Sequence, residues 1–253
     1  MEQFSRIIKL LGNDAFAHLR QSAVTVVGLG AVGGFVVEAL ARSGVGGLRL
    51  VDYDVVSASN INRQILALHS TIGQEKIAAA KERIADINPR CQVETLSLFA
   101  SEETMPTVLS PAPDLLIDAI DSLNPKTQLL TAAYVRAIPT LSSMGAALRA
   151  DPSQIRCGDL MATSGCPLAR HLRKRLRRRG IGAGIGAVYS REQVAFAYDE
   201  EDDFAASAHP GGRPRHILGS LPTITAIFGM TLANWAILKL AGLEEQSATP
   251  VSD

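Results

Sequence analysis

The sequence predicts an α/β fold with a doubly wound, mostly parallel sheet. Short apolar runs typical of buried strands alternate with helical patterns through the first 140 or so residues, and a glycine-rich turn joins the first such run to a helix. The chain has 253 residues, of which 47% are hydrophobic, enough for one large core. We expect one domain over residues 1–253, with a core at 1–150 and an extended C-terminal segment at 151–253.

The hydrophobic spacing indicates the individual elements of the core. A helix over residues 1–20 breaks at Gly12-Asn13, where glycine interrupts the pattern. Apolar runs bounded by turn residues predict the strands, and apolar positions three or four residues apart predict the helices. The expected strands are 24–27, 48–51, 92–98, 115–119 and 139–142, and the expected helices are 35–42, 74–87 and 125–136.

The C-terminal segment differs in composition from the core. It contains a basic helix at 168–179, a glycine-rich stretch at 181–187 and five consecutive acids at 199–203, which favour a loop. A Gly/Pro-rich loop at 207–220 precedes a final helix at 223–241. The apolar stretch 221–240 contains threonines, Asn234 and Lys239, which favour a buried helix over a membrane span.

Charge and cysteine content exclude several classes of protein. Lys plus Arg and Asp plus Glu number 25 each, so there is no global field for a polyanion and a nucleic-acid site has to be local. Cys91, Cys157 and Cys166 form no Cys-x-x-Cys pair, which argues against a disulfide framework or a four-thiolate zinc site. The first residues lack a basic region followed by an apolar one. We therefore expect a cytoplasmic protein without a membrane segment.

The glycine turn predicts a nucleotide site in a Rossmann-like fold. Gly28, Gly30 and Gly33 have the Gly-x-Gly-x-x-Gly spacing, which lets backbone N–H groups and a helix N-terminus face a phosphate. Asp52 ends the next strand 19 residues after Gly33, where an acid accepts hydrogen bonds from ribose hydroxyls. The alternative is that the glycines only permit tight packing.

Charged residues after the second strand favour ATP over NAD. Arg63 and Lys76 could neutralise the β and γ phosphates. Asp121 follows a strand at the carboxyl edge of the sheet and suits Mg²⁺ held by one carboxylate plus phosphates. Each of these charges alone is also typical of a solvated surface, so the prediction depends on the set.

Longer motifs around these residues resemble the adenylating superfamily of ThiF, MoeB and the ubiquitin-activating enzymes. They are Asp-x-Asp-x-Val and Asn-x-Asn-Arg-Gln within residues 52–64, Gly-Gln-x-Lys at 73–76 and Asp-Ala-x-Asp-Ser at 118–122. The resemblance implies attack of a carboxylate on the α-phosphate of ATP. It implies a homodimer in which Arg6 reaches the neighbouring subunit's triphosphate. The implied catalytic set is Arg6, Arg63, Lys76 and Asp121, with Asp121 on magnesium, and the implied nucleotide-binding set is Gly28, Gly30, Gly33, Asp52, Asp54, Asn60 and Gln64.

Further segments resemble one subgroup, the tRNA threonylcarbamoyladenosine dehydratases of the TcdA (CsdL, YgdL) type. They include Ala67-Leu-His-Ser70, Ile87-Asn-Pro89, Ser142-Ser-Met-Gly-Ala146 and Gly219-Ser-Leu-Pro222. The paired Cys-x-x-Cys motifs usual in the sulfur-carrier activators ThiF and MoeB are missing from this sequence. The resemblance implies a threonylcarbamoyl carboxylate on a tRNA adenosine beside the anticodon as the group adenylated. A nitrogen of the same side chain would then displace AMP, and no catalytic cysteine is required.

The basic helix predicts contact with the tRNA backbone. Leu168, Leu172 and Leu176 recur every four residues, so one stripe packs on the core while the cations face outward. Such a charge run is also typical of a solvated helix face, but a local concentration of cations fits phosphate contacts. Seven of the ten residues 170–179 are basic, and we expect tRNA to bind Arg170, Arg173, Lys174, Arg175, Arg177, Arg178 and Arg179.

Three other functions remain open from the residues. A sulfur-carrier adenylyltransferase would activate the C-terminal Gly-Gly of a protein, an NAD-dependent oxidoreductase would not need Arg63 or Lys76, and a nucleotide-binding scaffold would perform no chemistry. A sulfur-relay protein is a further candidate partner. Cys166 departs from the aspartate expected before this proline in the subgroup and is interpreted as incidental to catalysis, although related enzymes use cysteines.

Overall fold

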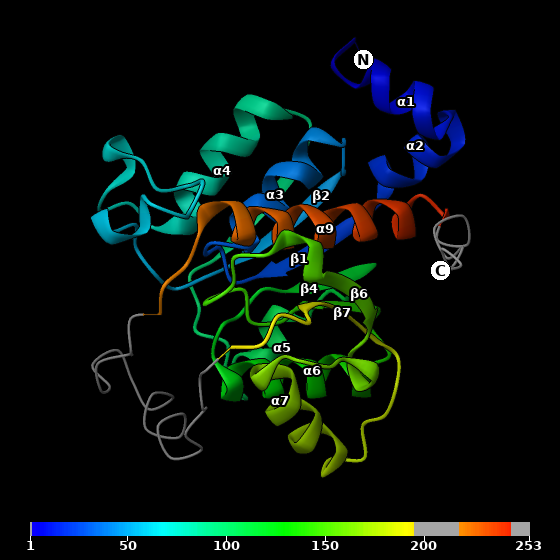
Figure 1. Ribbon diagram of the computed structural model, residues 1–253. Coiled ribbons are helices and arrows are strands. Elements are labelled where there is room, and N and C mark those ends of the chain that lie inside the picture. The colour runs from blue at the N-terminus through cyan, green and yellow to red at the C-terminus, as the bar shows by residue number, and fades with distance from the viewer. Residues whose placement is uncertain (1, 195–217, 244–253) are drawn as a thin grey trace.

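A sheet of seven strands runs through the computed structural model, which describes residues 2–194 and 218–243 (Figure 1). The strand order is β3-β2-β1-β4-β5-β7-β6, and every pairing is parallel except that of β6 with β7. The doubly wound fold expected from the sequence is confirmed. The strands are β1 Ala23–Val27, β2 Gly47–Val51, β3 Gln92–Leu96, β4 Leu115–Asp118, β5 Thr140–Ser143, β6 Ile155–Asp159 and β7 Ile185–Ser190.

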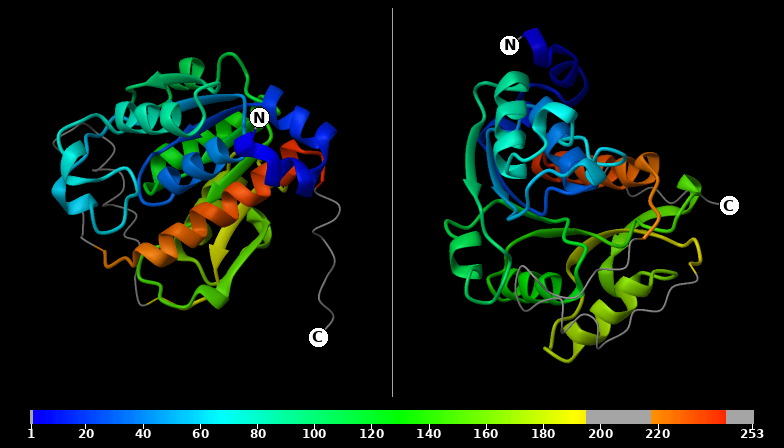
Figure 2. Two further views of the ribbon diagram at one scale, coloured as in Figure 1. Left: turned by 90° about the horizontal axis from the view of Figure 1, so that it is seen from above. Right: turned by 90° about the vertical axis from the view of Figure 1, so that its left-hand side faces the viewer.

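Helices cover both faces of the sheet. In Figures 1 and 2, α3, α4 and α9 lie on one face, α5 and α6 lie on the other, and α7 packs on α6. Leu29, Leu50 and Phe228 are among the buried residues between the first face and its helices. The helices are α1 Ser5–Leu11, α2 Asn13–Gln21, α3 Gly33–Arg42, α4 Lys76–Ile87, α5 Met105–Val108, α6 Leu123–Val135, α7 Pro167–Arg177 and α9 Pro222–Leu240.

The topology places the ends of β1 and β4 at the point where strand order reverses. β1 pairs with β2 on one side and with β4 on the other, so the connections leaving β1 and β4 diverge to opposite faces. Crevices outside the carboxyl ends of strands at such a point are where open α/β sheets bind ligands. The glycine turn follows β1 and Asp121 follows β4, so both lie at this edge.

Two strands, β6 and β7, were not expected from the sequence. β7 includes part of the glycine-rich stretch, which has no side-chain alternation that would signal a strand. A Cβ at Gly186 would lie 2.4 Å from Leu141 Cδ2 and 2.7 Å from Trp235 Cη2, so glycine admits these side chains beside the strand. β6 is a half-exposed edge strand that pairs antiparallel with β7. The C-terminal segment therefore adds two strands to the sheet.

Helix α9 is long and apolar enough to span a membrane by length and composition alone. It packs against α3, β5 and β7, and Ile224, Phe228 and Leu232 are buried among its residues. The buried core helix of a globular fold also meets these criteria of length and composition. The acids at 199–203, and all but the last residues of the loop at 207–220, lie outside the described residues.

Candidate functional site

The turn after β1 contains three glycines, and the backbone leaves no room for a side chain at two of them. Gly28 has a φ of 90°, and a Cβ there would lie 2.9 Å from the carbonyl oxygen of Ala119. A Cβ at Gly33 would lie 1.8 Å from the carbonyl oxygen of Gly28. At Gly30 the nearest atom to such a Cβ is Gln64 Nε2 at 3.9 Å. Tight packing thus accounts for Gly28 and Gly33, whereas the space at Gly30 suits the close approach of a ligand.

Asp52 ties the glycine turn to the end of β2. Its carboxylate accepts hydrogen bonds from the backbone N–H of Leu29 at 2.6 Å and of Asp54 at 2.9 Å. The residue is only 9% exposed, and burial raises the pKa of its carboxyl although Lys76 and the two N–H groups act in the opposite direction. Asp52 therefore holds the turn against the end of β2, and its ribose role stays a prediction.

Lys76, the first residue of α4, is paired with Asp54. Its Nζ lies 2.7 Å from Asp54 Oδ2. A short pairing of chain segments sets this geometry, because Val55 bridges to Glu75 and the Lys76 N–H donates to the Asp54 carbonyl. Two residues predicted to serve the nucleotide therefore lie together.

The segment between them carries Asn60, Arg63 and Gln64 on short turns. Arg63 donates to the carbonyl of Ser59 and to Asn62 Oδ1, and Asn60 Oδ1 accepts from the N–H of Ser57. Gln64 is 7% exposed, and its buried Oε1 has no hydrogen-bond partner among the described residues. A buried acceptor left open in this segment is suited to receive a donor from a ligand, and the Gln64 atom nearest to the space at Gly30 is the donor Nε2.

Asp121 is exposed just beyond β4, and Ser122 Oγ lies 3.2 Å from its Oδ1. Within residues 2–194 and 218–243, no cluster of three or more His, Cys, Asp or Glu residues could hold a metal ion by itself. One carboxylate at a nucleotide site nevertheless fits Mg²⁺, which keeps waters and takes its other ligands from substrate phosphates.

Sequence reasoning missed a buried network beside Asp121. It consists of Asp118, Lys126 and Ser142, joined by hydrogen bonds of 2.6 and 2.7 Å. A lysine in a helix is normally solvated, so nothing in the pattern of residues 123–135 signalled that Lys126 is buried.

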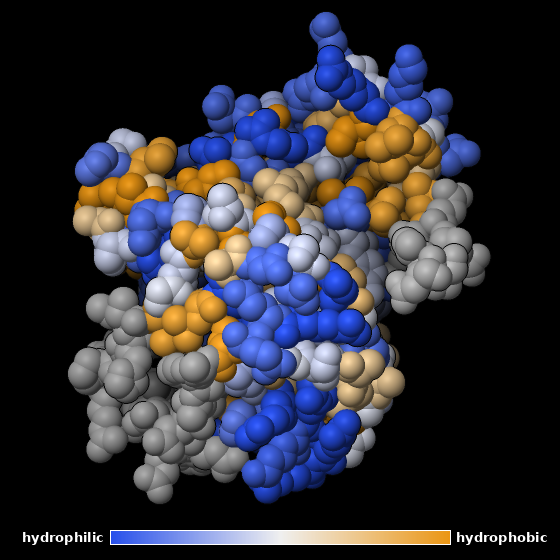
Figure 3. Space-filling model, in the orientation of Figure 1, coloured by the Kyte–Doolittle hydropathy of each residue, from blue (hydrophilic) through white to orange (hydrophobic). Residues whose placement is uncertain are grey.

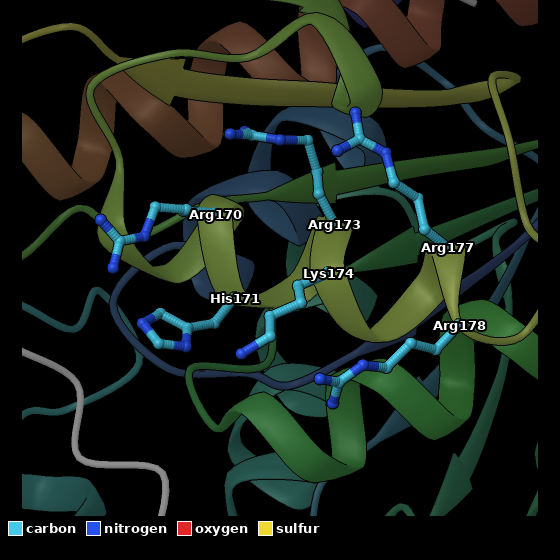
Figure 4. Close-up of a pocket in the computed structure, with 6 residues that line it drawn as sticks. All are labelled: Arg170, His171, Arg173, Lys174, Arg177 and Arg178. Atoms are coloured by element: carbon cyan, nitrogen blue, oxygen red, sulfur yellow. The ribbon is translucent and has the colours of Figure 1, made fainter.

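Helix α7 presents most of its cations on one surface. Leu168, Leu172 and Leu176 are fully buried, as the four-residue spacing predicts. The outward side forms an open hollow of about 430 Å³, lined by Arg170, His171, Arg173, Lys174, Arg177 and Arg178 (Figure 4). The surrounding surface is strongly hydrophilic (Figure 3).

The seven cations of α7 and its C-terminal turn are not equivalent. Arg173 is half-buried and donates to Thr163 Oγ1, and its pKa is lowered by burial and by the neighbouring Arg177 and Arg170. Arg175 and Arg179 lie outside the hollow, and Arg179 donates to the Arg175 carbonyl at 3.3 Å. The hollow thus gathers five of the seven predicted cations, together with His171.

Arg6 lies apart from these groups in its own chain. It is exposed on α1, which sits at the opposite end of the molecule from the segment 58–75 (Figures 1 and 2). The glycine turn, Asp52, Asp121 and the Asp54–Lys76 pair share the carboxyl edge of the sheet, and Arg6 does not.

A doubly wound sheet with a glycine turn, a buried acid at the second strand and paired charges beyond it defines a nucleotide-binding protein. The ThiF family model matches residues 4–251. The chain therefore belongs to the ThiF family.

Within that family, the similarity to tRNA threonylcarbamoyladenosine dehydratases spans most of the chain. The enzyme of that name from Bacillus subtilis is 44% identical over 192 residues, 76% of each chain. The structure of Escherichia coli TcdA in complex with ATP superposes with a TM-score of 0.84 at 33% identity and covers 98% of this chain and 97% of that one. The resemblance expected from the sequence is confirmed.

Sulfur-carrier activators match a smaller part of the chain. Molybdopterin-synthase adenylyltransferase from Salmonella typhimurium is 36% identical over 151 residues, 59% of each chain. The dehydratase of Escherichia coli, by contrast, is 33% identical over 250 residues, which cover 94% of this chain.

Proposed function

We propose that this chain is an ATP-dependent tRNA threonylcarbamoyladenosine dehydratase. The observation that carries the proposal is similarity to named dehydratases over nearly the whole chain, including the ATP complex of TcdA. The threonylcarbamoyl carboxylate attacks the α-phosphorus of ATP and pyrophosphate leaves. A nitrogen of the same side chain then attacks the acyl carbon and AMP leaves, so the nucleoside loses one water overall.

We assign roles in the first step, the adenylation, to residues at the carboxyl edge of the sheet. Lys76 and Arg63 neutralise charge on the phosphates, Asn60 helps to hold them, and Asp52 holds the ribose. At Gly30 no side chain blocks the approach of a phosphate, and Gln64 Nε2 is the nearest donor. The open amide oxygen of Gln64 accepts from a donor group of the ligand. A magnesium ion held by Asp121 would stabilise negative charge on the phosphate oxygens. Positive charge concentrated there lowers the barrier to attack on the α-phosphate.

Ring closure needs no protein nucleophile, because the attacking nitrogen and the acyl carbon belong to one side chain. The protein's part in this step is to exclude water from the acyl-adenylate. Cys166 is buried, 4% exposed, in the cluster between α6 and α7, which supports an incidental role.

The α7 hollow is the proposed tRNA site. Arg170, Lys174, Arg177 and Arg178 are exposed there, and cations on one helix suit the spaced phosphates of an RNA backbone. Phosphate contacts of this kind position the RNA without reading its sequence.

We further propose a homodimer that completes each site with the partner's Arg6. Because α1 lies far from the segment 58–75 of its own chain, an Arg6 that reaches a triphosphate has to come from a second copy. The three free cysteines fit a reducing cytoplasm, and a sulfur-relay protein remains a candidate partner.

Mass spectrometry of tRNA nucleosides tests the proposal. tRNA bearing threonylcarbamoyladenosine is incubated with the protein and Mg-ATP and digested under mild, amine-free conditions. Loss of one water from that nucleoside, only when ATP is present, is the expected result. An unchanged mass, with ATP–pyrophosphate exchange only on addition of a Gly-Gly-ended carrier protein, would instead assign the chain to the sulfur-carrier activators.

A further inference from the structure

A completely buried ion pair lies next to Asp121. Lys126 Nζ is 2.7 Å from Asp118 Oδ2, and both side chains are 0% exposed. Asp118 is the last residue of β4, and Lys126 lies in the second turn of α6. The pair therefore spans the loop that carries Asp121.

Two further hydrogen bonds of the pair converge on one residue of that loop. Asp118 Oδ1 accepts from the N–H of Ile120 at 3.1 Å, and Lys126 Nζ donates to the carbonyl oxygen of Ile120 at 2.8 Å. That carbonyl belongs to the peptide unit that joins Ile120 to Asp121. Lys126 thus fixes the peptide plane immediately before the Asp121 carboxylate.

The other side of the loop rests on the glycine turn. The N–H of Ala119 donates to the carbonyl of Val27 at 2.8 Å, and the Ala119 carbonyl lies where a Cβ on Gly28 would collide with it. Ser142 Oγ on β5 holds Asp118 Oδ2 at 2.6 Å. The loop is thereby set relative to both β1 and β5.

Stability alone does not account for the pair. Replacing a buried ion pair by apolar residues of similar volume is often neutral or stabilising, because desolvation offsets the attraction. An apolar pair could not, however, hold both polar groups of the Ile120 backbone. The function that only the charged pair performs is to orient the loop.

We propose that Lys126 is a positioning residue, which acts through the Ile120 carbonyl and through Asp118 to place the Asp121 carboxylate at the triphosphate. This inference rests on the proposed role of Asp121 as a magnesium ligand. Groups that orient a metal ligand typically change metal affinity or activity by about 10- to 100-fold when they are removed.

The test uses the full-length double variant Asp118→Asn/Lys126→Met. The asparagine keeps an acceptor for the Ile120 N–H, the methionine removes the donor to the Ile120 carbonyl, and no unpaired charge stays buried. Arg49→Met is the control, because it removes another buried cation, 2.7 Å from Glu94, away from the Asp121 loop.

Two readouts are compared at a temperature where thermal melting shows all proteins folded. In the double variant, amide hydrogen exchange in the peptide covering residues 118–122 is expected to be about tenfold faster, as loss of one hydrogen bond implies. The magnesium concentration for half-maximal AMP formation is expected to rise about tenfold, with KM for tRNA unchanged. The control is expected to change neither.

Unchanged exchange at residues 118–122 would overturn the proposal, as would equal changes in the control. Faster exchange with an unchanged magnesium requirement would also overturn the proposal, because it would show that Lys126 orders the loop without affecting the role of Asp121. Failure of the proposed function has a separate signature, because the unaltered protein would then form no AMP with tRNA. The exchange readout would in that case still decide whether Lys126 orders the loop.

Discussion

Lys76 Nζ lies 2.7 Å from Asp54 Oδ2, and the lysine is far more buried than its partner, with side-chain exposures of 6% and 43%. Asp54 is the solvent-facing member of the pair, and its carboxylate holds the buried Lys76 ammonium in one place before any ligand binds. Such preorganisation avoids ordering a flexible side chain when the ligand binds. The pair gives a direct prediction about nucleotide use.

Lys76→Ala is expected to lower kcat/KM for ATP by about 100-fold, because a preorganised cation next to developing phosphate charge contributes at about that level. Lys81→Ala is the matched control, since Lys81 is an exposed lysine on the same helix α4. The measurement is AMP formation as a function of ATP concentration with saturating tRNA. Equal activity of the two variants would refute the phosphate role of Lys76.

Reversal of two charges in the α7 hollow should weaken tRNA binding selectively. Lys174→Glu/Arg178→Glu is expected to reduce the slope of log affinity against log salt concentration by about 1 to 2, because each phosphate contact contributes somewhat less than one. The control is Lys81→Glu/Arg90→Glu, which changes the net charge by the same amount at two exposed residues outside the hollow. If filter-binding titrations give the control the same slope, the effect is one of net charge and the hollow is not the tRNA site.

Arg6 allows a test of the homodimer by complementation. Arg6→Ala and Lys76→Ala are each expected to retain only a small residual activity as pure proteins. In a mixed population half of the dimers pair one of each, and each mixed dimer has one intact site, so about a quarter of the unaltered activity should return. Activity is measured after the two proteins have been unfolded and refolded together. No recovery in a mixture shown to contain mixed dimers would contradict a role for Arg6 across the interface.

The strands at the centre of the fold could be predicted because they are buried on both faces and therefore read as short apolar runs. β1, β2 and β4 match the expected ranges within a residue or two. β7 escaped prediction because its glycine is fixed by Trp235 and Leu141, contacts that exist only after α9 has packed. Its neighbour β6 is an edge strand with exposed residues and no alternation.

Residues of the candidate site could be proposed from the sequence where they belong to a short motif. Hydrogen-bond and ion-pair partners that lie on different helices and strands could not. The spacing alone was enough to propose Gly28 and Asp52, and the structure places both at the carboxyl edge of the sheet. The link from Asp54 to Lys76 crosses 22 residues, and that from Asp118 to Ser142 crosses 24. Side-chain partners at such separations depend on strand order, which spacing does not specify.

The acid side of the stability curve should depend on Glu38. Burial raises the pKa of this carboxyl, but hydrogen bonds and charge from Arg83 and Arg42 outweigh it, so the net pKa lies below the usual 4.5. A carboxyl whose pKa is lowered by folding stabilises the protein above its unfolded pKa, and the stabilisation is lost as pH falls through the folded one. Glu38→Gln is expected to lower the free energy of unfolding by about 2 kcal/mol at pH 7.

The difference between Glu38→Gln and the unaltered protein should shrink as the pH falls below 4.5. Urea unfolding at pH 7 and at successively lower pH values measures it. A difference that stays constant over that range would show that the loss comes from packing rather than from the charge of Glu38.

A variant without cysteines should retain dehydratase activity. Burial raises the pKa of the Cys91 thiol to about 11, so this thiol stays protonated near neutral pH, whereas Cys157 is an exposed residue of the edge strand β6. Cys166 is buried among Leu168, Met144 and other apolar residues, and its replacement by alanine should cost about 1 kcal/mol of stability.

The variant Cys91→Ala/Cys157→Ser/Cys166→Ala is therefore expected to form the dehydrated nucleoside at a rate within about twofold of the unaltered protein, because intramolecular ring closure needs no thiol. The rate is measured by mass spectrometry of the nucleoside at a temperature where circular dichroism shows both proteins folded. Complete loss of product in a folded variant would require a thioester or persulfide step and would return the chain to the chemistry of the sulfur-carrier activators.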